Sequence, residues 1–328
     1  MGKCLITKLN GSVQNDSLLR IGEFIVKVSK VESPTANSQK FSIRNTKDIQ
    51  LRIIGDGYFT NETLTENKGK VMDITANTET LIYYSNGDYE IAVAEKYSLS
   101  SIGIFLSSSW KGFKGKLSFD IESLKYSTNI VNILLSDTQV TGDITELSKL
   151  TKVSTILLNN TKVTGDIAVF GKMANLIKLS IDYTKVTGDI AVFGKLTNLS
   201  DIPSVNKTLV TGDISVYKNI KTKSLQFSQT SVYGDLSILP NNVLWVQGGI
   251  GTFTWTGIKN RTNILAVAGC KCNNIDTYLN DMATLEAKFA GEDSWYKTIL
   301  LIGNRTSASD AAVQTLQSKG YTVSITPA

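Results

Sequence analysis

Apolar and polar positions recur in the same order through the middle of the chain, between residues 134 and 239. Five segments share this order: LLSDTQVTGDI, LLNNTKVTGDIAVFGKMANL, SIDYTKVTGDIAVFGKLTNL, KTLVTGDISVYKNI and FSQTSVYGDLSIL. Their turn glycines, which stand 23, 23, 24 and 22 residues apart, are Gly142, Gly165, Gly188, Gly212 and Gly234. A period of this length predicts a solenoid, in which each unit buries its apolar side against its neighbours.

Within a unit, apolar and polar positions alternate before the turn, as in Leu179-Ser180-Ile181. This alternation predicts a short strand whose leucine and isoleucine point into the solenoid while the serine faces outward. Successive units then add parallel strands about 4.8 Å apart, so equivalent side chains stack into ladders along the solenoid.

A threonine follows each strand, and a Gly-Asp pair follows each threonine. The threonine hydroxyl can satisfy backbone groups where the chain leaves the strand. The glycine permits a positive φ, and the aspartate can accept hydrogen bonds from nearby amides in an Asx turn. The predicted threonine ladder comprises Thr138, Thr161, Thr184, Thr208 and Thr230.

The aspartates of these turns have an alternative use as calcium ligands, because like charges stacked one unit apart repel. One carboxylate per turn falls short of the roughly six to eight oxygens that calcium takes. Lys162 and Lys185, in the same turns, can offset the charge instead. The aspartates are Asp143, Asp166, Asp189, Asp213 and Asp235.

The unit L-x-x-L-x-L-x-x-T-x-V-T-G-D-I resembles a leucine-rich repeat, with threonine where that family has asparagine or cysteine. Solenoids of this kind bind through the strand face that points away from the core. That face supplies the candidate binding residues, which are Asn132, Leu134, Ser136, Thr155, Leu157, Asn159, Lys178, Ser180, Asp182, Tyr183, Gln226 and Ser228.

The candidate face is a mixed polar surface. Its hydroxyls, amides and Tyr183 suit a glycan or a protein loop, while Leu134 and Leu157 side by side form an apolar strip suited to a protein contact. The plain alternative is a solvated sheet face made of good strand formers, with no ligand.

Atypical units are expected at both ends of a solenoid, because they cover its apolar ends. Residues 99–104 fit the strand pattern and residues 115–117 fit the turn, with an irregular step of 27 residues from Gly115 to Gly142. Residues 244–258 and 265–272 read as degenerate repeats, with Cys270 in the threonine ladder. After them we expect a helix over 275–289, a strand over 299–302, a helix from 307 to 319 and a strand over 321–325. Trp110, Trp245, Trp255 and Trp295 are expected to pack against these ends.

The first part of the chain lacks the period and alternates with period two, for example in residues 24–28, 41–43 and 49–53. Asn86-Gly87 predicts a tight hairpin between the strands that flank it. Polar loops are expected at 33–38 and 61–70.

The predicted fold is therefore mainly β with some α. An antiparallel N-terminal β-domain (1–98) runs without a linker into a solenoid (99–258), and degenerate repeats with an α/β cap (259–328) follow.

Composition argues against several functions. The chain has no histidine, which removes the Ser-His-Asp and Cys-His schemes and the commonest general base, so we expect no enzyme and no cofactor. The net charge of +5 is spread along the chain and gives nucleic acid no specific support. No apolar stretch approaches the roughly 20 residues needed to cross a membrane, and the start MGKCLITKLNGSV lacks the order of a signal peptide. Cys270 and Cys272 lack the two further ligands of a structural zinc site, and with Cys4 they cannot form a disulfide framework.

The N-terminal region resembles leucine-rich-repeat proteins encoded by phages of gut Bacteroidales, including crAss-like phages. The resemblance lies in MGKCLITKLNGSVQNDSLLRIGE, GDGYFT and IYYSNGDYEIAVA, followed by the VTGDI repeats. It implies a virion component made in the host cytoplasm, such as a head or tail fibre or a decoration protein. It further implies that the N-terminal domain docks to capsid or tail proteins or forms a homo-oligomer such as a trimer. A bacterial surface adhesion protein and a glycan depolymerase remain alternatives.

Overall fold

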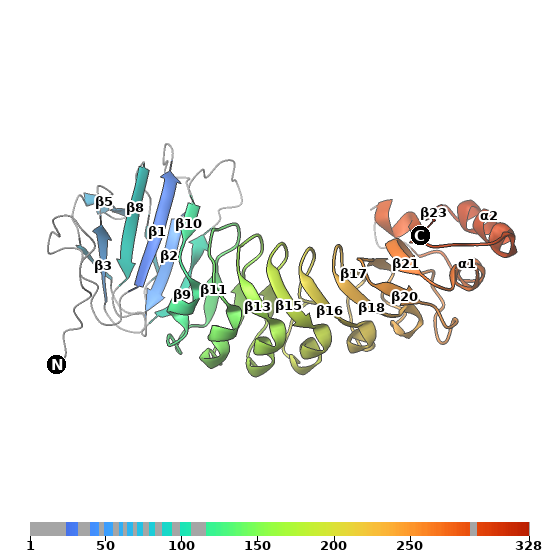
Figure 1. The fold of residues 1–328 in the computed structure, drawn as a ribbon, viewed down its shortest axis with the longest axis horizontal. Helices are drawn as coiled ribbons and strands as arrows, with labels where there is room; N and C mark the ends of the chain where they lie inside the picture. Colours follow the sequence, from blue (N-terminus) through green and yellow to red (C-terminus); the bar gives the residue numbers. More distant parts are fainter. Residues whose placement is uncertain are drawn as a thin grey trace.

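The computed structural model describes residues 116–288 and 294–327 throughout, and the strands β1 to β9 before them. Figure 1 shows the middle of the chain as a row of similar coils that lie side by side. Each coil contributes one strand to a first parallel sheet and, in most coils, one to a second parallel sheet, followed by a short 3-10 helix. The predicted solenoid is therefore confirmed.

The first sheet follows the predicted strand positions. It contains β11 (Asn132–Leu134), β12 (Thr155–Leu157) and β14 (Lys178–Ser180), which pair in parallel so that Ile133, Ile156 and Leu179 stand opposite one another. All three of these apolar side chains are buried. The same sheet face resumes with β17 (Ser224–Gln226) and β19 (Trp245–Gln247).

The second sheet forms where the sequence predicted only a turn. Its strands are β13 (Thr164–Asp166), β15 (Lys185–Asp189), β16 (Leu209–Asp213), β18 (Ser231–Asp235) and β20 (Thr252–Thr254). The 3-10 helices that follow the turns are η3 (Ile121–Leu124), η4 (Ile144–Lys149), η5 (Ile167–Lys172), η6 (Ile190–Lys195), η7 (Ile214–Tyr217) and η8 (Leu236–Ile238). One continuous apolar core fills the space between the sheets and these helices.

The threonine ladder is confirmed in position and in role. Every ladder threonine is buried, and each hydroxyl donates to the carbonyl oxygen three residues before it. From Thr138 to Thr230, these five hydrogen bonds measure 2.7, 2.7, 2.7, 2.6 and 2.8 Å. The hydroxyl therefore satisfies a carbonyl that the turn would otherwise leave unpaired inside the core.

The Gly-Asp turns behave as predicted and explain why glycine recurs. Each aspartate caps its 3-10 helix by accepting from the amide two residues on, as Asp166 does from Ala168 at 2.8 Å. Gly188 has a φ of +113°, and a Cβ there would lie 2.2 Å from Oδ1 of Asp166, one repeat back. Glycine is needed both for the backbone conformation and to leave room for the preceding carboxylate.

The first coil keeps the regular period. Asp120 caps η3 as Asp143 caps η4, and these two aspartates are 23 residues apart. Phe119 thus stands in the glycine position. The predicted turn at 115–117 and its step of 27 residues are wrong, because β10 (Lys116–Ser118) occupies this segment and pairs antiparallel with β1 (Phe24–Val31).

Before the solenoid, the predicted strands at 24–28, 41–43 and 49–53 appear as β1, β2 (Lys40–Asn45) and β3 (Ile49–Ile54). The segment 61–70 was expected to be a loop, but β5 (Leu64–Asn67) lies in it and pairs with β4 (Phe59–Asn61). β6 comprises Val71–Ile74. The predicted loop at 33–38, Cys4 and Trp110 lie outside the described residues.

The predicted Asn86-Gly87 hairpin is wrong. β7 (Glu79–Ile82) pairs with β2, whereas β8 (Gly87–Val93) pairs with β1 and β3 in a different sheet. An Asn-Gly dipeptide favours a tight reversal of the chain, but pairing also requires both flanking strands to be free of better partners.

β9 (Leu99–Phe105) links the antiparallel strands to the solenoid. It pairs antiparallel with β2 and parallel with β11, where Ile102 stands opposite Ile133. Residues 99–104 therefore do form the first solenoid strand. One six-stranded sheet runs from β7 through β9 to β14, so the two regions share backbone hydrogen bonds.

The C-terminal end follows the predicted order of helices and strands. It contains β21 (Ala266–Cys272), α1 (Ile275–Thr284), η9 (Ser294–Lys297), β22 (Thr298–Ile302), η10 (Ser307–Ser309), α2 (Asp310–Ser318) and β23 (Thr322–Thr326). α1 ends at Thr284, short of the predicted 289, and Lys319 Nζ donates to the carbonyls of Ala283 and Leu285 at that end. β21 lies beside β19 at its start and beside β20 at its end, and so joins the two sheets.

Candidate functional site

Every predicted face residue lies on the solvent side of the first sheet, half-buried or exposed. The parallel register brings them together, since Asn132 stands opposite Thr155 and Thr155 opposite Lys178. Leu134 and Leu157 are also direct neighbours, as the predicted apolar strip requires. The geometry of the candidate face is therefore as expected.

Hydrogen bonds between repeats fix many of these side chains. Asn159 Oδ1 accepts from the hydroxyls of Ser136 and, at 3.3 Å, Ser180. Asp182 accepts from the Ser180 hydroxyl at 3.2 Å, from the Ser204 hydroxyl and from the backbone amide of Asn206 at 2.9 Å. The face is thus an ordered polar lattice, which loses little conformational freedom on binding.

Ser204, Asn206 and Lys207 belong to this face and were missed in the sequence. Pro203 interrupts the apolar pattern of their unit and has no amide to donate, so the strand there shrinks to a single bridge between Ser180 and Ser204. A usable signal was the ladder threonine: Ser204 precedes Thr208 by four residues, as Ser180 precedes Thr184.

The residue just before each ladder threonine adopts a left-handed backbone conformation, with φ between +53° and +60°. These residues are Asp137, Asn160, Tyr183, Lys207 and Gln229. Non-glycine residues take this conformation at a cost of about 1 kcal/mol or more, so the surrounding turn must hold it. Tyr183 is 53% exposed, and the ammonium of Lys207 lies 4.5 Å from its ring centroid.

Two adjoining hollows lie along the C-terminal half of this face. The first has a volume of about 370 Å³ and is lined by residues of several repeats, among them Asp182, Tyr183 and Gln247. The second, of about 740 Å³, lies between the sheet and residues 294–300 of the C-terminal end. Gln226 and Gln247 line both, so the two hollows form one trough across the last repeats.

No protein-family model and no curated protein matches the sequence. Solved structures that resemble the chain include the plant peptide hormone receptor RGFR1 in complex with RGF2, with a TM-score of 0.43 and 14% identity over 71% of this chain and 41% of that one. A plant ice-binding protein has a TM-score of 0.38 and 17% identity over 63% of this chain and 58% of that one. For Pollen Receptor Kinase 3 the TM-score is 0.32 and the identity 23%, over 44% and 67%.

The chain spans 41% and 58% of the lengths of the first two of these proteins. The repeating unit itself decides the fold: a strand of the first sheet, a buried threonine and a capped 3-10 helix recur with the 22-to-24-residue period of the sequence. The repeats form a leucine-rich-repeat solenoid.

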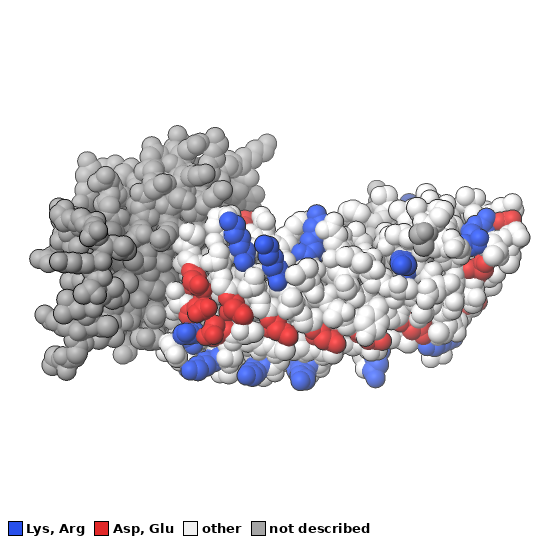
Figure 2. Space-filling model, in the orientation of Figure 1, with Lys and Arg blue, Asp and Glu red and all other residues white. Residues whose placement is uncertain are grey.

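The aspartate ladder of this leucine-rich-repeat solenoid is a set of helix caps. Figure 2 shows acidic side chains as a stripe along the lower part of the solenoid, with a row of basic side chains beneath it at the lower edge. Neither Lys162 nor Lys185 forms a salt bridge with a described residue, contrary to the expected offset of charge; Asp235 alone of the ladder pairs with a lysine, Lys259, at 3.2 Å. Within residues 116–288 and 294–327, no three Asp, Glu or Cys side chains gather as a metal site would require.

The two described cysteines are free and buried in the leucine-rich-repeat core. Burial raises the pKa of both thiols. The proximity of Cys272 raises the pKa of Cys270 further. Cys270 is buried and follows a residue of positive φ, Gly269 at +65°, as each ladder threonine does, but its Sγ lies 3.7 Å from the carbonyl oxygen of Val246 one repeat back, whereas each threonine hydroxyl bonds a carbonyl of its own turn. The turn is shorter here, because β21 bulges between Ala268 and Cys270 and runs from the first sheet into the second.

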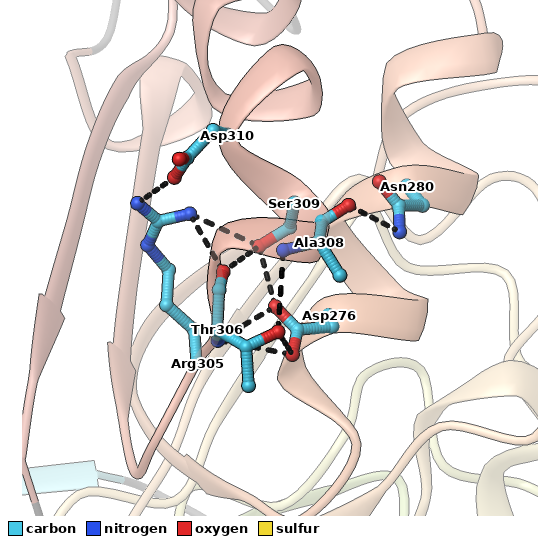
Figure 3. A network of polar contacts seen from close by, with 7 residues as sticks. All are labelled: Asp276, Asn280, Arg305, Thr306, Ala308, Ser309 and Asp310. Atoms are coloured by element: carbon cyan, nitrogen blue, oxygen red, sulfur yellow. Dashed lines mark hydrogen bonds and ion pairs between the residues drawn. The ribbon is translucent and has the colours of Figure 1, made fainter.

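A polar cluster in the C-terminal end joins α1 to the start of α2 (Figure 3). Asp276 accepts from the amide and hydroxyl of Thr306 and from the hydroxyl of Ser309. Hydrogen bonding from Ser309 is the main cause that lowers the pKa of Asp276; burial opposes it, and Thr306 and Arg305 add to it. Arg305 in turn bonds Asp310 at 2.5 Å. Each of these polar groups has a partner within the cluster, which identifies it as a structural joint.

The tryptophans divide into two kinds. Trp255 is fully buried and donates from Nε1 to Asp281 at 2.7 Å, and Trp245 is buried as well, as expected for end-covering residues. Trp295 departs from the expectation because it is 54% exposed, at a centroid distance of 6.3 Å from Trp245.

No helix of the described chain is long and apolar enough to cross a bilayer.

Proposed function

We propose that this chain is a non-enzymatic structural protein of a phage virion that contacts a protein or a host-surface glycan through the outward face of its first sheet. The observation that carries the proposal is the ordered polar lattice of that face. Its side chains are half-buried or exposed, hydrogen-bonded across repeats and placed at fixed intervals by a rigid parallel sheet.

The same face speaks against a depolymerase. Hydrolysis of a glycosidic bond commonly uses two carboxylates about 5 to 9.5 Å apart. Asp182 is the only carboxylate in the described lining of the two hollows, and it already accepts from Ser180, Ser204 and Asn206. Together with the absence of histidine from the sequence, this supports a binding role.

The virion assignment rests on the resemblance of the N-terminal region to leucine-rich-repeat proteins of Bacteroidales phages. In this proposal the N-terminal part docks to capsid or tail proteins or assembles a homo-oligomer, and the solenoid projects from the particle. The sheet shared by β2, β9 and β11 supports a stiff connection, because bending between the two parts would break backbone hydrogen bonds.

Mass spectrometry of purified phage particles tests the assignment. We expect peptides from the whole chain, including the repeats, in particles that survive washing at high salt. Absence of the protein from such particles, with presence in the envelope of bacteria that carry the gene, would contradict the proposal and favour the surface-adhesion alternative.

A further inference from the structure

Trp295 stands at the C-terminal end of the trough on the solenoid face. It is 54% exposed, and its ring lies at a centroid distance of 6.3 Å and an angle of 40° from that of Trp245. Trp245 is buried, and its indole Nε1–H has no hydrogen-bond partner among the described residues. Trp295 therefore presents an exposed aromatic face to the hollow, which Trp245 also lines.

No charged side chain is among the described residues that line the hollow around the two tryptophans. Its described lining consists of aromatic and aliphatic side chains together with Ser224, Gln226, Gln247, Ser294 and Thr298. Hydroxyl and amide groups can both donate and accept hydrogen bonds. An uncharged hollow with such groups offers no counter-ion for an acidic or basic ligand, but it suits a molecule that combines many hydroxyls with flat apolar faces.

The other exposed aromatic ring of the trough is differently placed. Lys207 lies 4.5 Å from the ring centroid of Tyr183, so a cation already covers one of its faces. Asp182 lies in the same hollow, and its oxygens are taken up by Ser180, Ser204 and Asn206. Trp295 is therefore the aromatic platform of the trough, and the region of Tyr183 forms its polar end.

We propose that this trough binds a neutral oligosaccharide, with one sugar ring stacked on Trp295 and neighbouring sugar hydroxyls bonded to Gln247 and Gln226. The proposal rests on the proposed function, since it takes the solenoid face to be a binding surface, and it deepens it by naming the ligand. The platform comes from the C-terminal end and the amides come from the repeats, so the site exists only where the end folds back onto the sheet.

A proline-rich peptide is the main competing ligand, because it also stacks on exposed aromatic side chains. The chemistry of the lining favours the sugar. Two glutamine amides and four side chains with hydroxyl groups line this hollow, whereas an extended proline-rich chain offers mainly carbonyl acceptors and few donors.

Calorimetric titration of the full-length protein with maltohexaose, cellohexaose, laminarihexaose and mannohexaose tests the proposal. We expect saturable binding of at least one of these sugars at micromolar to millimolar concentration, with a change in tryptophan fluorescence. Trp295→Ala is expected to weaken that binding by about tenfold or more, and Trp295→Phe by less, because a smaller ring remains. Gln247→Ala is expected to weaken it as well.

Ile250→Ala is the matched control, since Ile250 is an exposed apolar residue, at 69% exposure, that lines neither hollow. Its binding should equal that of the wild type. The proposal is overturned if none of the four sugars binds at millimolar concentration, if Trp295→Ala binds as well as the wild type, or if only an acidic hexasaccharide or a hexaproline peptide binds. Each of these outcomes leaves detection of the chain in purified particles unaffected, so failure of the ligand and failure of the virion assignment are distinguishable.

Discussion

The middle repeats and the C-terminal end differ in how they satisfy the polar backbone groups that their turns leave unpaired. In the repeats, three residue types at fixed positions stabilise every turn. Threonine satisfies a carbonyl, aspartate caps a helix and glycine makes room for the preceding aspartate. At the C-terminal end, single residues take on such tasks. Arg261, for example, is buried and donates to the carbonyls of Val243, Asn263, Leu239 and Pro240.

This difference shows where specific function can arise. A ladder constrains every unit to the same side chains, because each position meets the same neighbour in the adjacent repeat, as each turn glycine meets the aspartate of the repeat before it. The end has no next copy to match, so an unusual residue such as Trp295 can be placed there. The comparison predicts that substitutions in the ladder have similar effects in every repeat, whereas those at the end depend on the individual residue.

The largest expected effect is at the end. Trp255→Ala removes a fully buried side chain that packs edge-on against Tyr278 at a centroid distance of 5.5 Å and donates to Asp281. We expect a loss of about 4 kcal/mol in the free energy of unfolding, measured by urea titration. Trp295→Ala is the control and should lose less than about 1 kcal/mol. Equal losses would show that the two tryptophans do not differ as described.

A smaller effect is expected from the turn glycines, where two causes can be separated. Gly188 and Gly257 both have strongly positive φ, of +113° and +123°, but only Gly188 is crowded by a carboxylate. Gly257→Ala should therefore cost about 1 to 2 kcal/mol for the backbone alone, and Gly188→Ala clearly more. Thermal unfolding of both variants measures the difference. Equal losses of stability would mean that the Asp166 side chain moves aside without an energetic cost.

The threonine ladder should respond more weakly and uniformly. Thr184→Val keeps the shape of the side chain but leaves the carbonyl of Ile181 without its 2.7 Å hydrogen bond. We expect a loss of about 1 to 2 kcal/mol in the free energy of unfolding, and the same for Thr161→Val. A large difference between these two variants would contradict the equivalence of the repeats.

The smallest effect concerns the joint between α1 and α2. Because the pKa of Asp276 is lowered in the folded protein, its contribution to stability is complete above the unfolded-state pKa of about 3.9 and is lost as the pH falls through the lower, folded value. Asp276→Asn should therefore be less stable than the wild type at neutral pH, with the difference shrinking in acid. Melting temperatures measured from pH 7 downward test this, and a difference that grows in acid would exclude the assigned role.

The sequence was informative wherever one residue is repeated. The strands of the first sheet, the ladder from Thr138 to Thr230 and the capping aspartates all follow from the period, because each position has several copies to reveal it. The outward residues followed from strand alternation alone.

The sequence could not show in the same way which strands pair with each other, or where a repeat departs from the common residue. Nothing local shows that β7 and β8 belong to different sheets, or that Phe119 replaces a turn glycine. Asp120-Ile121, standing 23 residues before Asp143-Ile144, was the available signal for the latter.

At the candidate site, Pro203 concealed Ser204 and Asn206 by breaking the apolar pattern. The exposure of Trp295 depends on how the end folds back onto the sheet, which no periodicity specifies.

The central claim is that binding occurs on the first-sheet face, and a pair of serines three residues apart tests it directly. Ser228 lines the trough, whereas Ser231 is exposed on β18 of the second sheet. The measurement is flow cytometry of the labelled full-length protein on gut Bacteroidales cells, with Ser228→Arg and Ser231→Arg as variants. We predict that Ser228→Arg abolishes binding and Ser231→Arg retains it; the reverse result would place the binding surface on the second sheet and contradict the account.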